Sequence, residues 1–180
     1  MRFVFLALAL FAGAIYWMLH GEPTFVDTPI AGVAYSDESQ ASESNAKFEV
    51  SFDRVETADG DGSLRIDAQD EGLYTLLAYR GGPHNVSFRG LLFSARVRTE
   101  DVQGPVFLIL QAGIGRDHPA EMPVAGLEDS IEGDTGWTTL RAFAGNPQDT
   151  WLSSARLQIR IGGPGTVWVD DVRLVSRQAI

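Results

Sequence analysis

The stretch Ala-Arg-Leu-Gln-Ile-Arg-Ile at residues 155–161 decides the fold class. Its apolar residues alternate with arginine and glutamine, so one face of the segment is apolar and the other is polar. A period of two is typical of a strand that packs one face on a core and turns the other toward water. Residues 91–98 repeat the pattern, with Ser94, Arg96 and Arg98 on the polar side.

Segments of the same kind recur from residue 47 onward, separated by Gly, Pro, Asp and Asn. The predicted strands are 48–55, 63–68, 74–79, 86–99, 106–112, 137–144, 155–161 and 166–175. Residues 106–110, Val-Phe-Leu-Ile-Leu, are apolar on both faces, which predicts a central strand that is covered on both sides. The turn Gly-Gly-Pro-Gly at 162–165 predicts a hairpin-like reversal. Together these features indicate an all-β sandwich.

The composition excludes several classes of chemistry. The 180 residues include no cysteine, so disulfides, thiolate nucleophiles, and cysteine-ligated zinc or iron–sulfur sites are excluded. The three histidines lie in unrelated contexts, and no hydrolase, metalloprotease or phosphate-loop motif occurs. The sequence therefore predicts a protein that is not an enzyme. The longest irregular stretch, 113–136, is expected to be functional, flexible or to contain a short helix.

Four segments carry a resemblance to a known family. They are Gly62-Ser-Leu-Arg-Ile, Phe88-Arg-Gly-Leu-Leu-Phe-Ser-Ala-Arg-Val-Arg, Thr135-Gly-Trp-Thr-Thr-Leu and Gly165-Thr-Val-Trp-Val-Asp-Asp-Val-Arg-Leu. Over roughly residues 48–175 the chain resembles the galactose-binding-like jelly roll of carbohydrate-binding modules of the family 4/9 type. The resemblance implies a jelly-roll β-sandwich. It also implies a structural calcium near the last strand, with Asp170 or Asp171 and the earlier Glu49 as ligands; alternatively, the aspartates cap or bulge the strand.

Sugar-binding members of this group present aromatic side chains on an exposed strand face. The candidate platforms here are Trp137, Trp151 and Trp168, with a place in the core or at its rim as the alternative for Trp137 and Trp168. The outward positions of two predicted strands instead carry arginine: Arg96, Arg98, Arg156 and Arg160. Such a partner or ligand face suits carboxylates on another protein, anionic lipid headgroups, or the acidic residues of this chain itself.

Residues 3–19 form an uncharged, mostly apolar run that includes Phe3, Leu10, Tyr16 and Trp17. A helix of this length covers about 25 Å and can just span a bilayer. A signal peptide cleaved near Ala14 is the alternative, but the apolar run continues beyond that site. Arg2 before the run and acidic residues after it predict a cytoplasmic N-terminus and a periplasmic C-terminal domain at a bacterial inner membrane.

The acidic residues concentrate in the first third of the chain. Residues 22–71 hold 13 acidic and 3 basic residues, whereas residues 72–180 are nearly balanced. The polar run 36–46 indicates a spacer, so we divide the chain into a transmembrane signal anchor (1–21), an acidic extended linker (22–46) and a jelly-roll domain (47–180). The alternative for residues 24–35 is an extended segment that lies along a neighbouring protein. Neither half is basic enough to predict nucleic-acid binding.

A retained anchor, the lack of a catalytic motif and an arginine-bearing face together suggest a function. The leading prediction is a membrane-anchored accessory subunit that docks on a larger membrane complex, such as a respiratory or photosynthetic assembly. Tethering raises the effective concentration of a small domain at the membrane, so a modest interface suffices. The alternative is a membrane-tethered carbohydrate-binding module for glycan or peptidoglycan.

Overall fold

The computed structural model describes residues 25–35, 47–80, 86–87, 90–114, 120–145 and 151–179. Within these ranges the chain consists of ten strands and one short 3-10 turn, η2. Their bounds are β1 Phe25–Val33, β2 Phe48–Asp53, β3 Ser63–Ala68, β4 Gly72–Arg80, β5 Val86–Ser87, β6 Gly90–Ile114, β7 Ala120–Ala125, η2 Leu127–Asp129, β8 Ile131–Gly145, β9 Trp151–Ile161 and β10 Gly165–Ala179.

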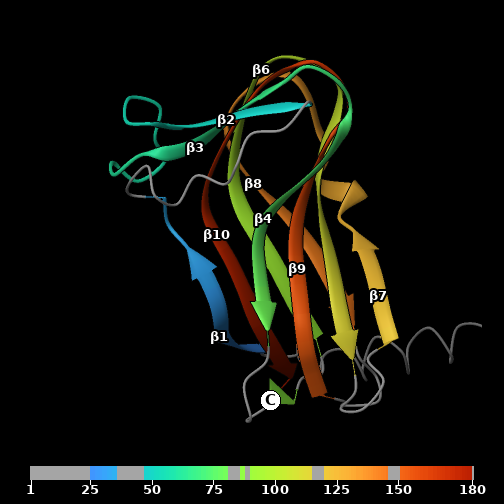
Figure 1. Cartoon of the computed structure of the whole chain (residues 1–180). Coiled ribbons are helices and arrows are strands. Elements are labelled where there is room, and N and C mark those ends of the chain that lie inside the picture. The colour runs from blue at the N-terminus through green and yellow to red at the C-terminus, as the bar shows by residue number, and fades with distance from the viewer. Residues whose placement is uncertain are drawn as a thin grey trace, which may run out of the picture.

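The strands form one continuous antiparallel sheet of ten strands that folds over, so that its two halves, here called the first and the second sheet, pack face to face (Figure 1). In the first sheet the early part of β6 lies between β8 and β10, and β10 in turn pairs with β3 and, further along, with β1. In the second sheet the later part of β6 lies between β9 and β7, and β9 also pairs with β4 and β5. The all-β sandwich predicted from the alternating segments is therefore confirmed.

The two sheets are joined because β6 crosses from one to the other. Its residues 90–100 pair with β10 and its residues 106–114 pair with β9. The crossing between them uses positive φ angles at Asp101 (54°) and Gly104 (111°). The segment 162–165 crosses beside it, where the N–H of Gln103 donates to the carbonyl of Pro164 at 2.9 Å. Since β9 and β10 lie in different sheets, this turn joins the sheets and does not form the expected hairpin.

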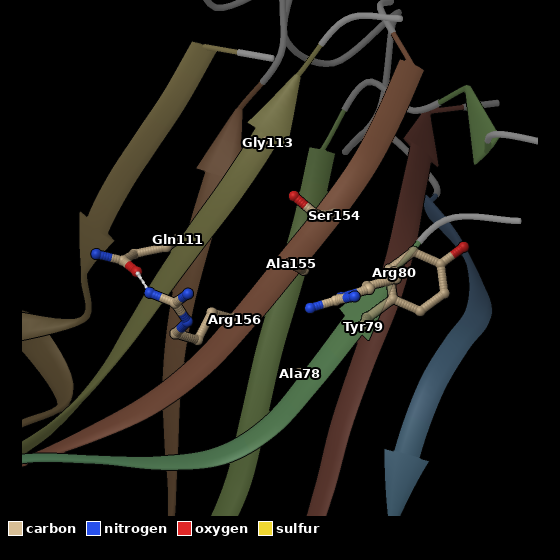
Figure 2. A pocket seen from close by; sticks show the side chains of 8 residues that line it. All are labelled: Ala78, Tyr79, Arg80, Gln111, Gly113, Ser154, Ala155 and Arg156. Carbon is tan, nitrogen blue, oxygen red and sulfur yellow. Dashed lines mark hydrogen bonds between the residues drawn. The ribbon is translucent and has the colours of Figure 1, made fainter.

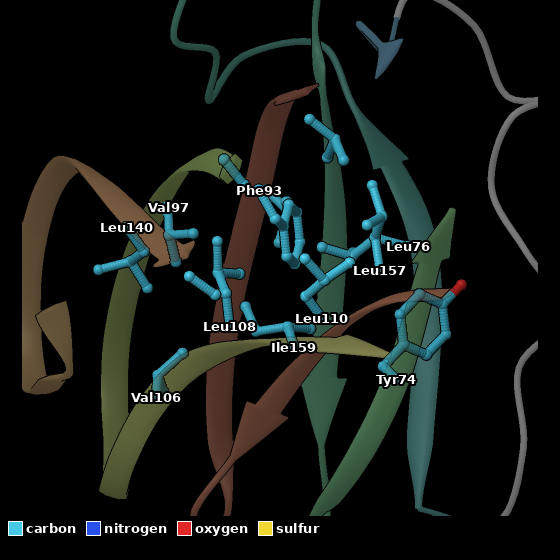
Figure 3. Packing of buried hydrophobic residues seen from close by; sticks show 14 of the residues in the cluster. Tyr74, Leu76, Phe93, Val97, Val106, Leu108, Leu110, Leu140, Leu157 and Ile159 are labelled. Carbon is cyan, nitrogen blue, oxygen red and sulfur yellow. The ribbon is translucent and has the colours of Figure 1, made fainter. Parts of the chain in front are cut away.

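One apolar core fills the space between the sheets (Figure 3). Alternate residues of the early part of β6, such as Phe93 and Val97, face inward from the first sheet and are fully buried. Leu108, Leu157 and Ile159 face them from the second sheet and are equally buried. This alternation is the physical origin of the pattern at residues 155–161, and it leaves the other face of each strand pointing away from the core.

Two strands lie where no strand was expected. Within the predicted linker, β1 pairs with the end of β10 over residues 25–33, and the Tyr35 side chain that follows is only 2% exposed. The sandwich therefore begins before residue 47. Within the irregular stretch 113–136, β7 pairs with the end of β6 and is followed by η2 and the start of β8.

No helix within the described ranges is long and apolar enough to cross a membrane.

Candidate functional site

The outer face of the second sheet carries a patch of mostly polar side chains. Three strands contribute to it, β4, β9 and the later part of β6, in cross-strand rows set by their pairing. The rows are Leu73–Arg160–Phe107, Thr75–Gln158–Ile109, Ala78–Arg156–Gln111 and Arg80–Ser154–Gly113. We call these twelve residues the β9 face. Neighbouring side chains in such rows lie close enough to contact one ligand.

A hollow of about 190 Å³ lies at one end of the β9 face (Figure 2). Its polar lining comes from Arg80 on β4, Gln111 on β6, and Ser154 and Arg156 on β9. Gly113 has no side chain and the side chain of Ala78 is only a methyl group, so both residues leave room above the sheet. Larger residues around them form the walls, which makes the hollow a consequence of small residues on two strands.

Hydrogen bonds hold the polar side chains of the face in place. The Arg156 guanidinium donates to the side-chain oxygen of Gln111 at 3.1 Å (Figure 2). The Gln158 amide, on a residue only 8% exposed, donates to the Thr75 hydroxyl at 3.3 Å. Among the described residues its own Oε1 atom has no hydrogen-bond partner. This oxygen is itself buried, so a ligand on the β9 face reaches it only when the Gln158 side chain rotates outward.

The charges on the β9 face are mainly positive. Arg160 donates to Glu71 at 2.7 Å and is thereby neutralised. Arg80 and Arg156 occupy diagonal positions on neighbouring strands, and no ion pair joins either of them to a carboxylate in the described part of the chain. The hollow therefore presents two guanidinium groups, an amide and a hydroxyl, which is a set of hydrogen-bond donors with few acceptors.

The structure separates the four arginines that were predicted to form one partner face. Arg156 and Arg160 lie on the β9 face, whereas Arg96 and Arg98 point outward from the first sheet on the other side of the core. Arg98 forms an ion pair with Glu56 and Arg160 one with Glu71. Both acidic partners belong to residues 22–71, the acidic first third of the chain.

The predicted tryptophan platforms also occupy different environments. Trp168 is 4% exposed, its indole donates to Asp53 at 2.9 Å, and its ring lies against the guanidinium groups of Arg98 and Arg65 at 4.6 and 5.4 Å. Those contacts leave the ring almost no accessible surface, so Trp168 does not offer a platform for stacking a sugar. Trp137 is partly buried on β8, and the side chain of Trp151 lies outside the described residues.

The structure does not bring the three predicted calcium ligands together. Glu49 on β2 pairs with Asp67 on β3, and Asp67 pairs with Thr166 on β10. Thr166 is four residues away from Asp170 along β10. Four strand residues span about 13 Å, too far for a shared ion. Within the described ranges no three acidic or histidine side chains are grouped as metal ligands.

The two aspartates at the β10 bulge instead serve the fold. Asp170 is fully buried, and its oxygens accept the backbone N–H groups of Asp171 at 2.7 Å and Ala58 at 3.3 Å. Burial raises the pKa of Asp170, the bond from Asp171 opposes this, and the negative charge of Asp59 adds to it. Asp171, at a φ of 50°, accepts from Arg173 at 2.6 Å. These residues therefore fit the alternative prediction, in which they shape a bulge.

Phe3, Leu10, Tyr16 and Trp17, which the sequence predicts to lie in a membrane, are outside the described residues. Gln158, Gln111, Ser154 and Arg80 were not among the site residues predicted from the sequence. The alternation at 155–161 already placed Gln158 on the polar side of its strand. What the sequence could not supply is the register that sets β4 and β6 beside β9, because that register depends on contacts between residues far apart in the chain.

Neither a model of a known protein family nor a curated protein sequence matches this chain. Solved structures of carbohydrate-binding modules do match its fold. The CBM22-1 xylan-binding domain of Xyn10C from Paenibacillus barcinonensis matches at a TM-score of 0.53 and 13% identity, over 86% of this chain and 98% of that domain. The C-terminal family 22 module of Xyn10B from Clostridium thermocellum matches at 0.53 and 13%, over 84% and 95%.

A longer structure from Clostridium thermocellum contains a CBM22-1 module joined to the GH10 module of xylanase 10B, in complex with xylohexaose. It matches at a TM-score of 0.58 and 11% identity, over 84% of this chain but 29% of that longer protein. The matches therefore extend over a binding module and not over a whole enzyme. The chain has the β-sandwich fold of these carbohydrate-binding modules.

Proposed function

We propose that this chain is a non-catalytic carbohydrate-binding module that holds a polysaccharide on the β9 face. The observation that carries the proposal is the hollow at one end of this face, lined by Arg80, Gln111, Ser154 and Arg156. Beside it lies Gln158, which has a polar atom without a partner among the described residues although it is almost fully buried.

Sugar hydroxyls suit such a surface because each can donate and accept a hydrogen bond. Leaving a buried polar atom without a partner costs roughly 1–3 kcal/mol, and rotation of the Gln158 amide toward a bound hydroxyl would remove that cost. Gln111 and Arg156 already hold each other at 3.1 Å, so little side-chain entropy would be lost when they bind a ligand. At the other end of the face, Leu73 (43% exposed) and Phe107 offer apolar surface to the C–H groups of a sugar ring.

The structural matches support this proposal at the level of fold. Two of them are modules whose names concern xylan binding or ligand binding in a cleft. This agrees with the alternative drawn from the sequence, a carbohydrate-binding module, better than with docking on a membrane complex. The closer assignment to the family 4/9 type, the anchor at the inner membrane and the docking on a membrane assembly remain predictions.

Affinity electrophoresis of the full chain in mild detergent tests the proposal. Native gels are cast with xylan, glucomannan, mixed-linkage glucan, polygalacturonate or alginate. We expect at least one polysaccharide to retard the chain, and the double variant Gln111→Ala, Gln158→Ala to migrate as if no polysaccharide were present. Gln103→Ala is the matched control, because Gln103 is exposed at the crossing of β6 and lies outside the β9 face.

Retardation that the double variant retains would contradict the placement of the site. A chain that no polysaccharide retards would contradict the proposed function itself.

A further inference from the structure

The two arginines of the hollow have the least compensated charges on the β9 face. Arg80 lies opposite Ser154, and Arg156 lies two residues further along β9, so the two side chains are diagonal neighbours on one face (Figure 2). Diagonal neighbours in an antiparallel pair have their Cα atoms about 7–8 Å apart. Two arginines that are neighbours on one face repel each other electrostatically, and an anion bound between them would offset that repulsion.

Three other arginines on the strands have carboxylate partners. Arg160, Arg98 and Arg177 each form an ion pair with a carboxylate of residues 22–71. Within the described ranges Arg156 donates to a neutral amide, and Arg80 is exposed. Although the chain has a net charge of −10, no carboxylate of the described residues forms an ion pair with either arginine of the hollow.

We infer that the glycan held on the β9 face is anionic, a polysaccharide whose sugar rings carry carboxylate groups, and that Arg80 and Arg156 bind one carboxylate between them. The inference rests on the proposed function and adds the chemical class of the ligand. Guanidinium groups donate paired N–H bonds that match the two oxygens of a carboxylate. Gln158, Gln111 and Ser154 would then bind the hydroxyls of the same or the neighbouring ring.

A sugar is favoured over an acidic peptide or a lipid headgroup by the rest of the face. A ligand recognised by its negative charge alone would need to contact only the two arginines. The face also carries the amide of Gln158, whose buried oxygen would gain a partner when the side chain rotates toward a ligand. It carries the exposed apolar side chain of Leu73 as well, roughly 20 Å of strand away from Arg80. A polymer of several sugar rings would contact both regions at once, through hydroxyls and through the apolar side of its rings.

Isothermal titration calorimetry of the full chain in mild detergent tests the inference. The probes are hexamers of galacturonate and of mannuronate, a hyaluronan hexasaccharide, neutral xylohexaose, and polyglutamate as a carboxylate polymer without sugar. We expect at least one carboxylated hexasaccharide to bind at least about tenfold more tightly than xylohexaose and polyglutamate, a difference of about 1.4 kcal/mol. This affinity should fall as the salt concentration rises.

Variants separate the arginines from the rest of the face. Arg80→Gln combined with Arg156→Gln should lower the affinity for the carboxylated glycan at least about tenfold. Arg141→Gln, on the outer side of the first sheet, is the matched control and should leave it unchanged. Unfolding curves of the variants and the wild type check that each variant is folded. Arg156→Lys keeps the charge but not the paired donors, so it should retain more affinity than Arg156→Gln but less than the wild type.

The outcomes distinguish this inference from the proposed function. Tight binding of xylohexaose that the double variant leaves unchanged would overturn the anionic class while supporting a carbohydrate-binding module. Equal binding of polyglutamate would overturn it as well, because the site would then recognise charge without sugar. If no carbohydrate binds at all, both the inference and the proposed function fail.

Discussion

Gln158 occupies the middle of the β9 face and is held there by a hydrogen bond to Thr75. Its exposed fraction of 8% means that water reaches its amide poorly, so the partnerless polar atom makes the free protein less stable than an apolar residue of similar volume would. Residues that lower stability are common at binding sites, and Gln158 would gain its missing partner when its amide rotates toward a bound ligand.

We therefore predict opposite effects of Gln158→Met on stability and on binding. The substitution keeps the volume and removes the buried amide, so the free energy of unfolding should stay equal or rise by up to about 1 kcal/mol. Glycan affinity should fall. Urea unfolding and calorimetric titration measure the two effects, with Gln103→Met as control. A variant that is clearly less stable, or one that binds glycan unchanged, would contradict the role assigned to Gln158.

Asp170 and Asp53 provide a second test at the scale of single residues, because their pKa values shift in opposite directions. Burial, together with the charge of Asp59, raises the pKa of Asp170. For Asp53 burial also acts upward, but hydrogen bonds from the Trp168 indole and from the N–H groups of Val55 and Glu56 outweigh it and lower the pKa. A raised pKa in the folded state favours folding at low pH, and a lowered one favours folding at higher pH.

The stability that Asp170 contributes should therefore be greatest below about pH 3.9, the pKa of an aspartate in an unfolded chain, and be lost as the pH rises through the folded pKa. Relative to Asp170→Asn, the wild type should lose stability as the pH rises from about 3 to about 7, by at most about 1.4 kcal/mol per pH unit. Relative to Asp53→Asn it should gain stability over the same range. Urea unfolding across this range measures both. Parallel pH profiles for the two variants would contradict the assigned environments.

At the scale of elements, the crossing between the sheets is the most constrained part of the fold. Residues 162–165 pack against residues 101–105 of β6, and Gly165 adopts a φ of 142°. A Cβ atom on Gly165 would lie 2.5 Å from the Cα of Val102 and 2.8 Å from the carbonyl oxygen of Asp101. The backbone conformation and the close approach of two chain segments both require glycine at this position.

Gly165→Ala should consequently lower the free energy of unfolding by about 2–4 kcal/mol, because strain from φ and from overpacking add together. Gly60→Ala is a matched control, since Gly60 has a φ of 110° but a Cβ atom there would meet no other atom within 4 Å. It should cost only about 1 kcal/mol. Chemical unfolding of both variants measures the difference, and equal losses would show that the close packing of the two crossings contributes nothing.

β1 is the other element whose role the sequence left open. It pairs with the outer end of β10, and the bidentate contact of Arg177 with Asp27, at 2.8 and 2.7 Å, fastens it on the exposed side. After β1, the Tyr35 hydroxyl donates to the carbonyl of Leu76 at 3.3 Å and so connects this segment to β4 in the second sheet. Burial raises the pKa of Tyr35, with smaller contributions from Tyr74 and Asp170, which keeps its hydroxyl protonated as a donor.

Removing that hydroxyl with Tyr35→Phe should lower the free energy of unfolding by about 1 kcal/mol, since the Leu76 carbonyl loses this donor. Tyr79→Phe is a suitable control, because Tyr79 lies at the rim of the core on the same strand as Leu76. Thermal unfolding compares the two. If Tyr35→Phe is no less stable than Tyr79→Phe, the segment after β1 does not fasten the two sheets.

At the scale of the molecule, the sequence was sufficient to predict the two-layer architecture. Alternation at 155–161 and 91–98 directly reflects which side chains face the common core, and both segments lie in strands of the structure. The predicted strand 63–68 coincides with β3. The sequence could not predict β1, because residues 25–33 lie in an acidic region and contain a proline, and their pairing with β10 joins segments about 150 residues apart.

The candidate site was predictable only in part, for the same physical reason. Arg156 and Arg160 were recognised as outward residues of one strand. Their placement apart from Arg96 and Arg98 follows from the crossing of β6 at residues 101–105, which sends its two halves to different sheets. Arg80 and Gln111 join the hollow through strand pairing alone, and a register between distant strands leaves no mark on the local sequence.

The lack of cysteine in the chain allows a direct measurement of where the glycan binds. Ser154→Cys places a single thiol in the hollow, and Ser94→Cys places one on the outer side of the first sheet. Each is alkylated with and without a saturating amount of the polysaccharide that retards the chain. We predict that the polysaccharide slows alkylation at position 154 at least about tenfold, as expected for a site that is blocked while occupied, and leaves position 94 unchanged. Two results would contradict a glycan site on the β9 face. One is that the polysaccharide slows alkylation at position 94; the other is that it binds but slows alkylation at neither position.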